Sequence, residues 1–360
     1  MVIGTRREVL EGLPASRGFA GLASVLVMTF AIGLVPSRGA ADSLDDDGKH
    51  CTATAKAVHS ACRKGVESDY WIAFAICINM SDEEERKECF ADAKDSRREG
   101  DQLCREQRDG RREACESLGE GRYDPEIDPA SFDTDFVHPA NPNPYYPLVI
   151  GYRWELRGGP EFNTLDVVNE TKLIDGVTCI VVRDQVFQNG DLVENTDDWF
   201  AQNKNGDVHY FGEEVKDFES FEGDDPRRPE LVSISGSFKS GRDGDKGGVI
   251  FFASPTKGQT YTEEFSLGNA EDVTEILSTT YAFGSDPELD RFVPRRLAEL
   301  LCFGNCVVTK NFSLLEPGVF ARKYYARGIG FFLEVNPDTR EVVQLVNCNF
   351  DPRCGALPTP

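Results

Sequence analysis

Two carboxylates and one histidine are the residues whose types and spacing could support catalysis. Asp198 and Glu213 lie in consecutive strand-like runs joined by an Asn-Gly turn, so cross-strand pairing could bring them together. Two carboxylates flanking a cleft can hydrolyse glycosides. His209 lies in an alternating run beside the same turn. These three are the catalytic candidates of a secreted hydrolase, although a chain with 62 acidic residues makes chance pairs common.

No complete catalytic motif supports the hydrolase hypothesis. The chain has neither a G-x-S-x-G elbow nor an H-E-x-x-H motif, and neither a metal site nor a cofactor is predicted. Non-catalytic binding is therefore the leading functional hypothesis. A curved sheet could hold an apolar or sugar ligand between aromatic rings on its concave face. The candidate ligand-binding residues are Trp199, Tyr210, Tyr324 and Tyr325.

The first six cysteines form a palindrome. Their successive spacings are 11, 15, 12, 15 and 11 residues, which read the same in both directions. Residues at equal distances from the tip of an antiparallel hairpin lie opposite each other, so one of the fifteen connectivities is symmetric. The predicted disulfides are Cys51–Cys115, Cys62–Cys104 and Cys77–Cys89.

The segments that carry these cysteines have helical composition. Residues 51–79 and 83–118 lack proline and are rich in Ala, Lys, Arg and Glu, and Ser81 with Glu84 could form a capping box. Cysteines 11 or 15 residues apart share one helical face. A zinc site is the alternative, but no C-x-x-C pair is present. A disulfide-stapled helical hairpin is predicted.

The other five cysteines allow more than one arrangement. A nested pairing of Cys306 with Cys348 and Cys302 with Cys354 is one solution. Two local bridges, Cys302–Cys306 and Cys348–Cys354, are the other. Cys179 lies in a largely apolar run and is expected to be a buried free thiol.

The N-terminus predicts export. Arginines precede an apolar run over residues 18–35, and small residues before Asp42 offer a cleavage site. The alternatives of an uncleaved anchor and of twin-arginine rather than general export stay open. No later run is long enough to cross a bilayer. We expect a periplasmic, cell-surface or extracellular protein, which fits eleven cysteines.

The charge of the chain restricts its partners. Residues 1–41 carry four arginines and two glutamates, so the remainder of a chain with net charge −23 carries −25. Such a surface repels phosphate backbones, and nucleic-acid binding is therefore not expected. A small molecule, a glycan or an envelope partner is the expected ligand.

The pattern changes twice along the chain. Residues 119–144 contain repeated Asp-Pro and Asn-Pro pairs and predict an extended linker. Residues 145–354 read as many short strands with tight turns, including Asn189-Gly190, and as short helices at 270–277 and 294–301. The predicted class is α+β, with the signal peptide at 1–41, the hairpin at 42–118, an antiparallel curved or half-barrel sheet, and a tail at 355–360.

Several motifs also resemble a known group of sequences. The chain is similar to uncharacterised secreted bacterial proteins with a six-cysteine helical N-terminal region and a β-rich domain. The resemblance implies this fold and export, but no activity, and members usually carry Trp where this chain has His209. The motifs that carry it are residues 145–148, 198–202, 206–213, 270–272, 315–318 and 323–326.

These observations give three functional hypotheses. The first is a non-catalytic envelope protein that binds a ligand or partner through its β domain. The second is a secreted hydrolase that uses paired carboxylates. The third is a structural surface protein whose stapled helices hold the β domain away from the envelope.

Overall fold

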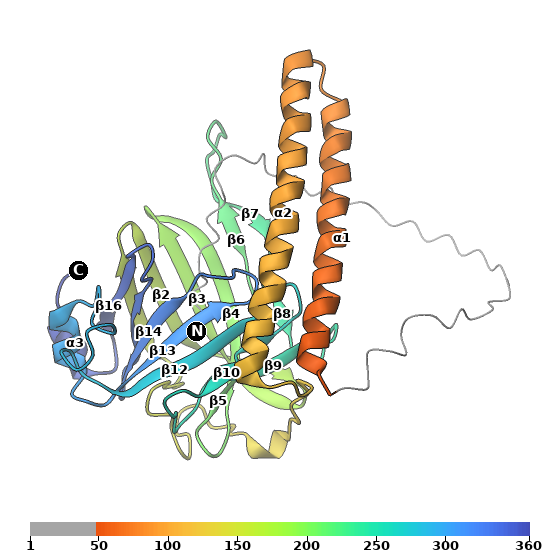
Figure 1. The fold of residues 1–360 in the computed structure, drawn as a ribbon. Helices are drawn as coiled ribbons and strands as arrows, with labels where there is room; N and C mark the ends of the chain where they lie inside the picture. Colours follow the sequence, from red (N-terminus) through yellow and green to blue (C-terminus); the bar gives the residue numbers. More distant parts are fainter. Residues whose placement is uncertain (1–47) are drawn as a thin grey trace. The chain divides into compact units, whose positions relative to one another are not determined.

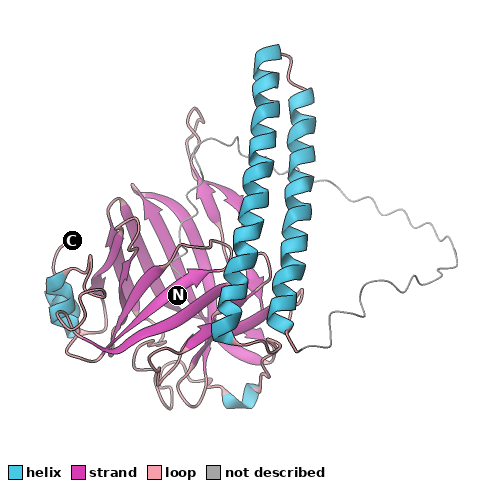
Figure 2. Cartoon of the chain, viewed as in Figure 1, coloured by secondary structure: helices cyan, strands magenta, loops and turns pink. Residues whose placement is uncertain are grey.

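The computed structural model describes residues 48–360, so the predicted signal segment lies outside the described residues. Two long antiparallel helices, α1 (His50–Ile78) and α2 (Glu83–Leu118), precede a sheet of many strands (Figures 1 and 2). The strands form one antiparallel sheet that is nearly closed and barrel-like. The predicted fold class is confirmed.

The helical hairpin has the predicted disulfides. The Cα atoms of the pairs Cys51–Cys115, Cys62–Cys104 and Cys77–Cys89 lie 5.8, 5.8 and 5.6 Å apart. These distances suit a disulfide. The palindrome therefore gives the correct connectivity.

Local packing and capping complete the hairpin. A Cβ at Gly100 would come within 2.8 Å of Val66, so glycine allows the close approach of the two helices. The predicted Ser81 cap is wrong by one residue. The Asp82 side chain instead accepts hydrogen bonds from the backbone N–H groups of Glu84 and Glu85, because a carboxylate at the N-cap can satisfy the free N–H groups of the first turn.

The β domain contains sixteen strands. They are β1 (Arg153–Gly158), β2 (Glu161–Ile174), β3 (Val177–Gln188), β4 (Asp191–Gln202), β5 (Val208–Glu214), β6 (Asp217–Glu219), β7 (Glu230–Ser233), β8 (Phe238–Lys239), β9 (Lys246–Phe251), β10 (Thr260–Thr262), β11 (Glu264–Phe265), β12 (Asp272–Tyr281), β13 (Cys306–Ser313), β14 (Ala321–Ala326), β15 (Gly330–Val335) and β16 (Val342–Cys348).

Two meanders build most of the sheet. Strands β1 to β5 pair in sequence order, as do β12 to β16, and β16 pairs with β1. The ends of this order are β10, which pairs with β12, and β11, which pairs with β9. A single residue, Glu263, separates β10 from β11. One short stretch of chain therefore joins both ends of the sheet, and this connection brings the barrel close to closure.

One predicted helix is a strand and the other is a helix. Residues 270–277 belong largely to β12, in which Val273, Thr274 and Ile276 are buried and the chain pairs with both β10 and β13. β-Branched residues favour such a position over a helix. The second helix is confirmed as α3 (Arg295–Leu301), which buries Leu297, Ala298 and Leu301.

Residues 119–150 pack on the barrel at several points. Phe132 and Phe136 are buried, and a short 3-10 helix spans Pro129–Ser131. The Asn143 side-chain amide donates to the carbonyls of Gly206 and Phe251, and the Asn143 backbone N–H donates to Gln202 Oε1. The proline-rich segment is thus tied to the ends of β4, β5 and β9 by side-chain hydrogen bonds.

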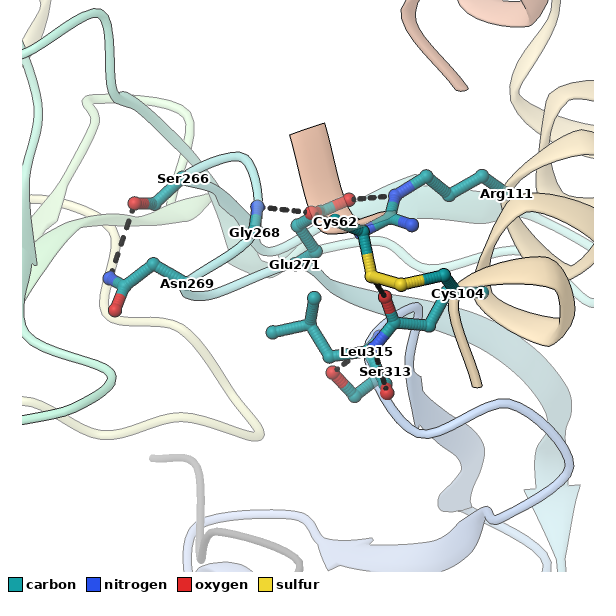
Figure 3. Close-up of polar contacts among 10 residues, drawn as sticks. Cys62, Cys104, Arg111, Ser266, Gly268, Asn269, Glu271, Ser313 and Leu315 are labelled. Atoms are coloured by element: carbon teal, nitrogen blue, oxygen red, sulfur yellow. Dashed lines mark hydrogen bonds and ion pairs between the residues drawn. A yellow bond between two sulfur atoms is a disulfide. The ribbon is translucent and has the colours of Figure 1, made fainter. Parts of the chain in front are cut away.

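A buried ion pair ties the hairpin to the β domain. The Arg111 guanidinium donates two hydrogen bonds of 2.8 and 2.7 Å to Glu271, and both residues are at most 4% exposed (Figure 3). The Gln107 amide donates to the carbonyl of Leu315 nearby. Planar bidentate pairing of this kind fixes orientation as well as distance.

The remaining cysteines adopt the local arrangement. Cys302 bonds to Cys306 and Cys348 to Cys354, while Cys179 is a buried free thiol, as predicted. Cys306 and Cys348 lie on β13 and β16, which two other strands separate in the sheet, so a nested bridge between them is not formed.

Candidate functional site

The two candidate carboxylates are direct neighbours. Asp198 on β4 lies opposite Glu213 on β5, as the hairpin between them predicts. The Tyr210 hydroxyl donates a 2.5 Å hydrogen bond to Asp198 Oδ1. Burial raises the pKa of Asp198, and burial together with the charge of Asp198 raises the pKa of Glu213 well above its ordinary value. Two such groups favour sharing one proton over full ionisation.

Burial separates Asp198 from solvent, whereas Glu213 is partly exposed. Asp198 is only 1% exposed, and Tyr210 is fully buried. A glycosidase needs its two carboxyl groups on opposite sides of a substrate cleft. Asp198 lies in the interior, so the two carboxyl groups do not flank an open cleft. Two neighbouring carboxyl groups can in principle catalyse hydrolysis, but Asp198 is packed in the core.

Further carboxylates share this interior. Asp184, Asp198, Glu263 and Glu264 are each at most 4% exposed. Both side-chain oxygens of Asp184, and one each of Asp198 and Glu264, lack a hydrogen-bond partner among the described residues. Burial is the largest cause of the raised pKa of each of them. Protonation or hydration of these groups would relieve the energy of burying them unpaired.

Glu263 is the best-partnered of these acids. It accepts hydrogen bonds from the Thr274 hydroxyl and the Asn311 amide, and Thr309 in turn donates to Asn311. Burial raises the pKa of Glu263 to about 7, although the charge of Lys323 opposes the shift. Lys323 is itself 3% exposed, with its ammonium 3.8 Å from Glu334. The residue that connects β10 to β11 is therefore a carboxyl group that titrates near neutrality.

His209 has a structural environment. Its ring packs edge-on against Phe132 with centroids 5.1 Å apart, and Nε2 lies 3.3 Å from the Asn203 amide. Burial lowers the pKa of His209, which keeps the ring neutral at pH 7. His209 on β5 pairs with Ala201, next to the pair of Phe200 and Tyr210. Successive residues of a strand point to opposite faces, so His209 lies on the face opposite Tyr210 and its partner Asp198.

The four aromatic candidates are buried and do not form one site. Tyr210 and Tyr325 lie in the interior, where Tyr210 stacks on Phe200 and Tyr325 contacts Phe251 on a distant strand. Trp199 belongs to a separate apolar cluster with Phe132, and Lys172 lies over its ring. The Tyr324 hydroxyl donates to the carbonyl of Leu289. Each ring therefore has its own packing role.

A groove lined in part by arginines lies on the β domain. It has a volume of about 450 Å³ and lies between the start of α3, the β1–β2 turn, β16 and the last residues of the chain. Its polar lining consists of Arg157, Arg295, Arg296, Gln344 and Thr359. A second hollow near Tyr146 and Trp154 measures about 20 Å³, which is room for about one water.

Sheet pairing explains how the groove forms. Arg157 on β1 lies opposite Gln344 on β16, so both side chains emerge on one face of the sheet. The flanking pair, Leu156 with Leu345, is fully buried on the other face. Gln344 also donates to the carbonyl of Pro358, which holds the C-terminal segment along the groove.

The groove carries a net positive charge. Arg295 pairs with Glu299, whereas Arg296 has no carboxylate partner among the described residues. Two acids near these strands accept hydrogen bonds from other groups: Glu161 from the Asn163 amide and Glu341 from the Thr339 hydroxyl. No Asp or Glu side chain is among the residues that line the groove in the described chain. In a protein of net charge −23, this is a local reversal of sign.

Comparisons with known proteins add no assignment. No family model, curated protein or solved structure matches the chain. The helical region with disulfides and the β-rich domain are both present. The resemblance to uncharacterised secreted bacterial proteins stays a prediction.

Proposed function

We propose that this protein is an exported, non-catalytic binding protein whose β domain holds an anionic small molecule in the arginine groove. The observation that carries the proposal is the groove itself: about 450 Å³ lined by three arginines and no Asp or Glu side chain, on a strongly acidic protein. This volume falls within the range of small-molecule sites.

The chemistry of the lining indicates the class of ligand. Guanidinium groups offer planar pairs of donors that match carboxylates, phosphates and sulfates. Pro294, Val342 and Pro358 add apolar surface beside them. An anion with an apolar or aromatic body would use both parts of the groove. The lining contains no His, Cys, Asp or Glu side chain within the described chain, which favours binding over chemistry.

Export is supported independently of the groove. Five disulfides are typical of an oxidising compartment, and the N-terminal sequence has the pattern of a signal peptide. No helix in residues 48–360 has the length and apolar character that crossing a bilayer requires. A periplasmic or extracellular location is the proposal that follows.

Calorimetric titration with 2-naphthoate tests the binding function, with 2-naphthamide as the uncharged comparison. We expect the acid to bind and the amide not to bind. Arg296→Gln should weaken binding by about tenfold, or about 1.4 kcal/mol. Arg227→Gln, at a surface arginine outside the groove, should leave it unchanged. Equal binding of acid and amide, or equal effects of both variants, would contradict the proposal.

A further inference from the structure

The end of α1 exposes an apolar face. Trp71, Ile72, Ile76 and Ile78 are 55, 61, 54 and 59% exposed. At 100° per residue, these four and Ala75 cover an arc of roughly 160° on one side of the helix. We call this set of five residues the apolar tip face. Large apolar side chains exposed together in this way mark an interaction surface.

The interior side of the same turns is already packed. Phe74 contacts Phe90 with ring centroids 4.7 Å apart, and Cys77 bonds to Cys89. Packing between α1 and α2 therefore uses the opposite side of α1 and leaves the apolar tip face uncovered by the rest of residues 48–360. The disulfide beside it holds the face in one conformation, which lowers the entropy lost on binding.

Acidic residues border the apolar tip face. Glu67 and Asp69 precede it, and residues 82–88 carry five acids and two bases, so that residues 67–88 have a net charge of −5. Several of these charges are engaged locally: Glu67 pairs with Arg97, Lys87 pairs with Glu83 and Glu84, and Arg86 donates to the carbonyl of Met80. The border available to a partner is therefore negative.

We infer that the apolar tip face docks an amphipathic helix of another protein, with an apolar side bordered by lysines and arginines. Its apolar side would cover Trp71, Ile72 and Ile76, and its cations would face the acidic border. A second copy of this chain would bring like charges together, and an anionic bilayer would also be repelled. Charge complementarity thus selects a basic helical partner. This inference does not depend on the groove.

Trp71 provides the readout. The other two tryptophans, Trp154 and Trp199, are each 5% exposed, so acrylamide quenching of the oxidised full chain reports chiefly on Trp71. The probe is an 18-residue amphipathic peptide of leucine and lysine. We expect it to protect Trp71 from quenching and to shift its emission to shorter wavelength. The same peptide with glutamate in place of lysine should do neither.

Variants separate docking from general attraction to an acidic protein. Ile72→Ser with Ile76→Ser keeps every charge and should weaken the peptide at least tenfold. Leu231→Ser with Ile234→Ser, at apolar residues 55 and 63% exposed near β7, is the matched control and should change nothing. Equal affinities for both variants would overturn the inference.

Two other results would also overturn it. Protection of Trp71 that grows with protein concentration alone would assign the face to a second copy. Protection of Trp71 by phosphatidylcholine vesicles in the absence of the peptide, with or without phosphatidylglycerol, would assign the face to a membrane. Circular dichroism of each variant should match the parent, because the replaced side chains are exposed.

Discussion

The helical hairpin and the barrel solve the problem of stability in different ways. The hairpin spans helices of 29 and 36 residues but buries only two residues of α1 and five of α2. In place of a large core, three disulfides stabilise the hairpin by restricting its unfolded state. The barrel has an extensive aromatic core that also contains carboxyl groups. The comparison teaches that the first region should respond to changes in its cross-links and the second to pH.

The ion pair that joins the two regions should give the largest effect. Arg111→Met would leave Glu271 charged, buried and short of its partner, which costs about 3–5 kcal/mol. Urea unfolding measures the loss, and hydrogen exchange of α2 amides reports release of the hairpin. Arg112→Met, at the exposed neighbouring residue, should have little effect.

A compensating variant sharpens this prediction. Arg111→Met with Glu271→Leu removes both charges, so much of the lost stability should return. Glu271 also accepts a hydrogen bond from the Gly268 N–H, and recovery should therefore be incomplete. A double variant as unstable as Arg111→Met would show that the charge left behind was not the cause.

The disulfides of the hairpin should contribute in the order of their loop lengths. Cys51–Cys115 closes a separation of 64 residues and Cys77–Cys89 one of 12. Loop entropy predicts about 4 kcal/mol for the outer bridge and about 3 for the inner one. Replacing Cys51 and Cys115 together by Ser should lower the melting temperature further than replacing Cys77 and Cys89. The reverse order would refute the entropic explanation.

The two regions also differ in how far the sequence predicts them. The hairpin follows from cysteine spacing alone, because helical geometry relates positions along the chain to positions in space. The β3–β4 hairpin is predictable for a similar local reason: Asn189 and Gly190 adopt φ values of 53° and 95°. Strand β12 was mistaken for a helix because its pairing with β10 and β13 is set by distant residues.

The groove and the acidic interior depend on topology. Arg157 on β1 and Arg296 on α3 are far apart in sequence but line one groove, which the pairing of β1 with β16 helps to form. The adjacent pair Arg295-Arg296 in an acidic chain was the available signal. Lys323 on β14 comes near Glu263 because β10, β12, β13 and β14 are successive neighbours in the sheet. The Asp198–Glu213 pair was predictable because a single hairpin forms it, but its burial was not.

The barrel should lose stability as pH rises from about 4.5 to about 7. Burial raises the pKa of Glu194 and of Glu263 to about 7 from ordinary values near 4.5. A raised folded-state pKa means that the native protein binds more protons than the unfolded chain between pH 4.5 and pH 7. The free energy of unfolding therefore decreases with pH, by on the order of 3 kcal/mol for Glu263.

Glu263→Gln isolates this contribution. The amide oxygen can still accept from Thr274 and Asn311, but it does not titrate. Urea unfolding at pH 5 and pH 7.5 should show a smaller decrease for the variant than for the parent. His209 acts in the opposite sense below pH 6.5 because burial lowers its pKa, and it cancels in the comparison of the two proteins. Equal pH slopes would contradict the prediction.

The smallest expected effect is that of Asp198→Asn. The amide keeps an oxygen for the Tyr210 hydroxyl and removes a carboxyl whose ionisation is opposed by burial and by Asp197 nearby. Because the pKa of Asp198 is raised in the native protein, we expect the variant to gain stability relative to the parent as pH rises from 5 to 8, measured by urea unfolding. Asp197→Asn is the matched control: it breaks a partly exposed pair with Arg183 and should instead lose up to about 1 kcal/mol. A loss of stability at pH 8 for Asp198→Asn would mean that the charged form is favoured in the native protein.

The same variant tests the hydrolase hypothesis. If the parent turns over a substrate in a panel of glycans and esters and Asp198→Asn does not, the barrel opens to substrate.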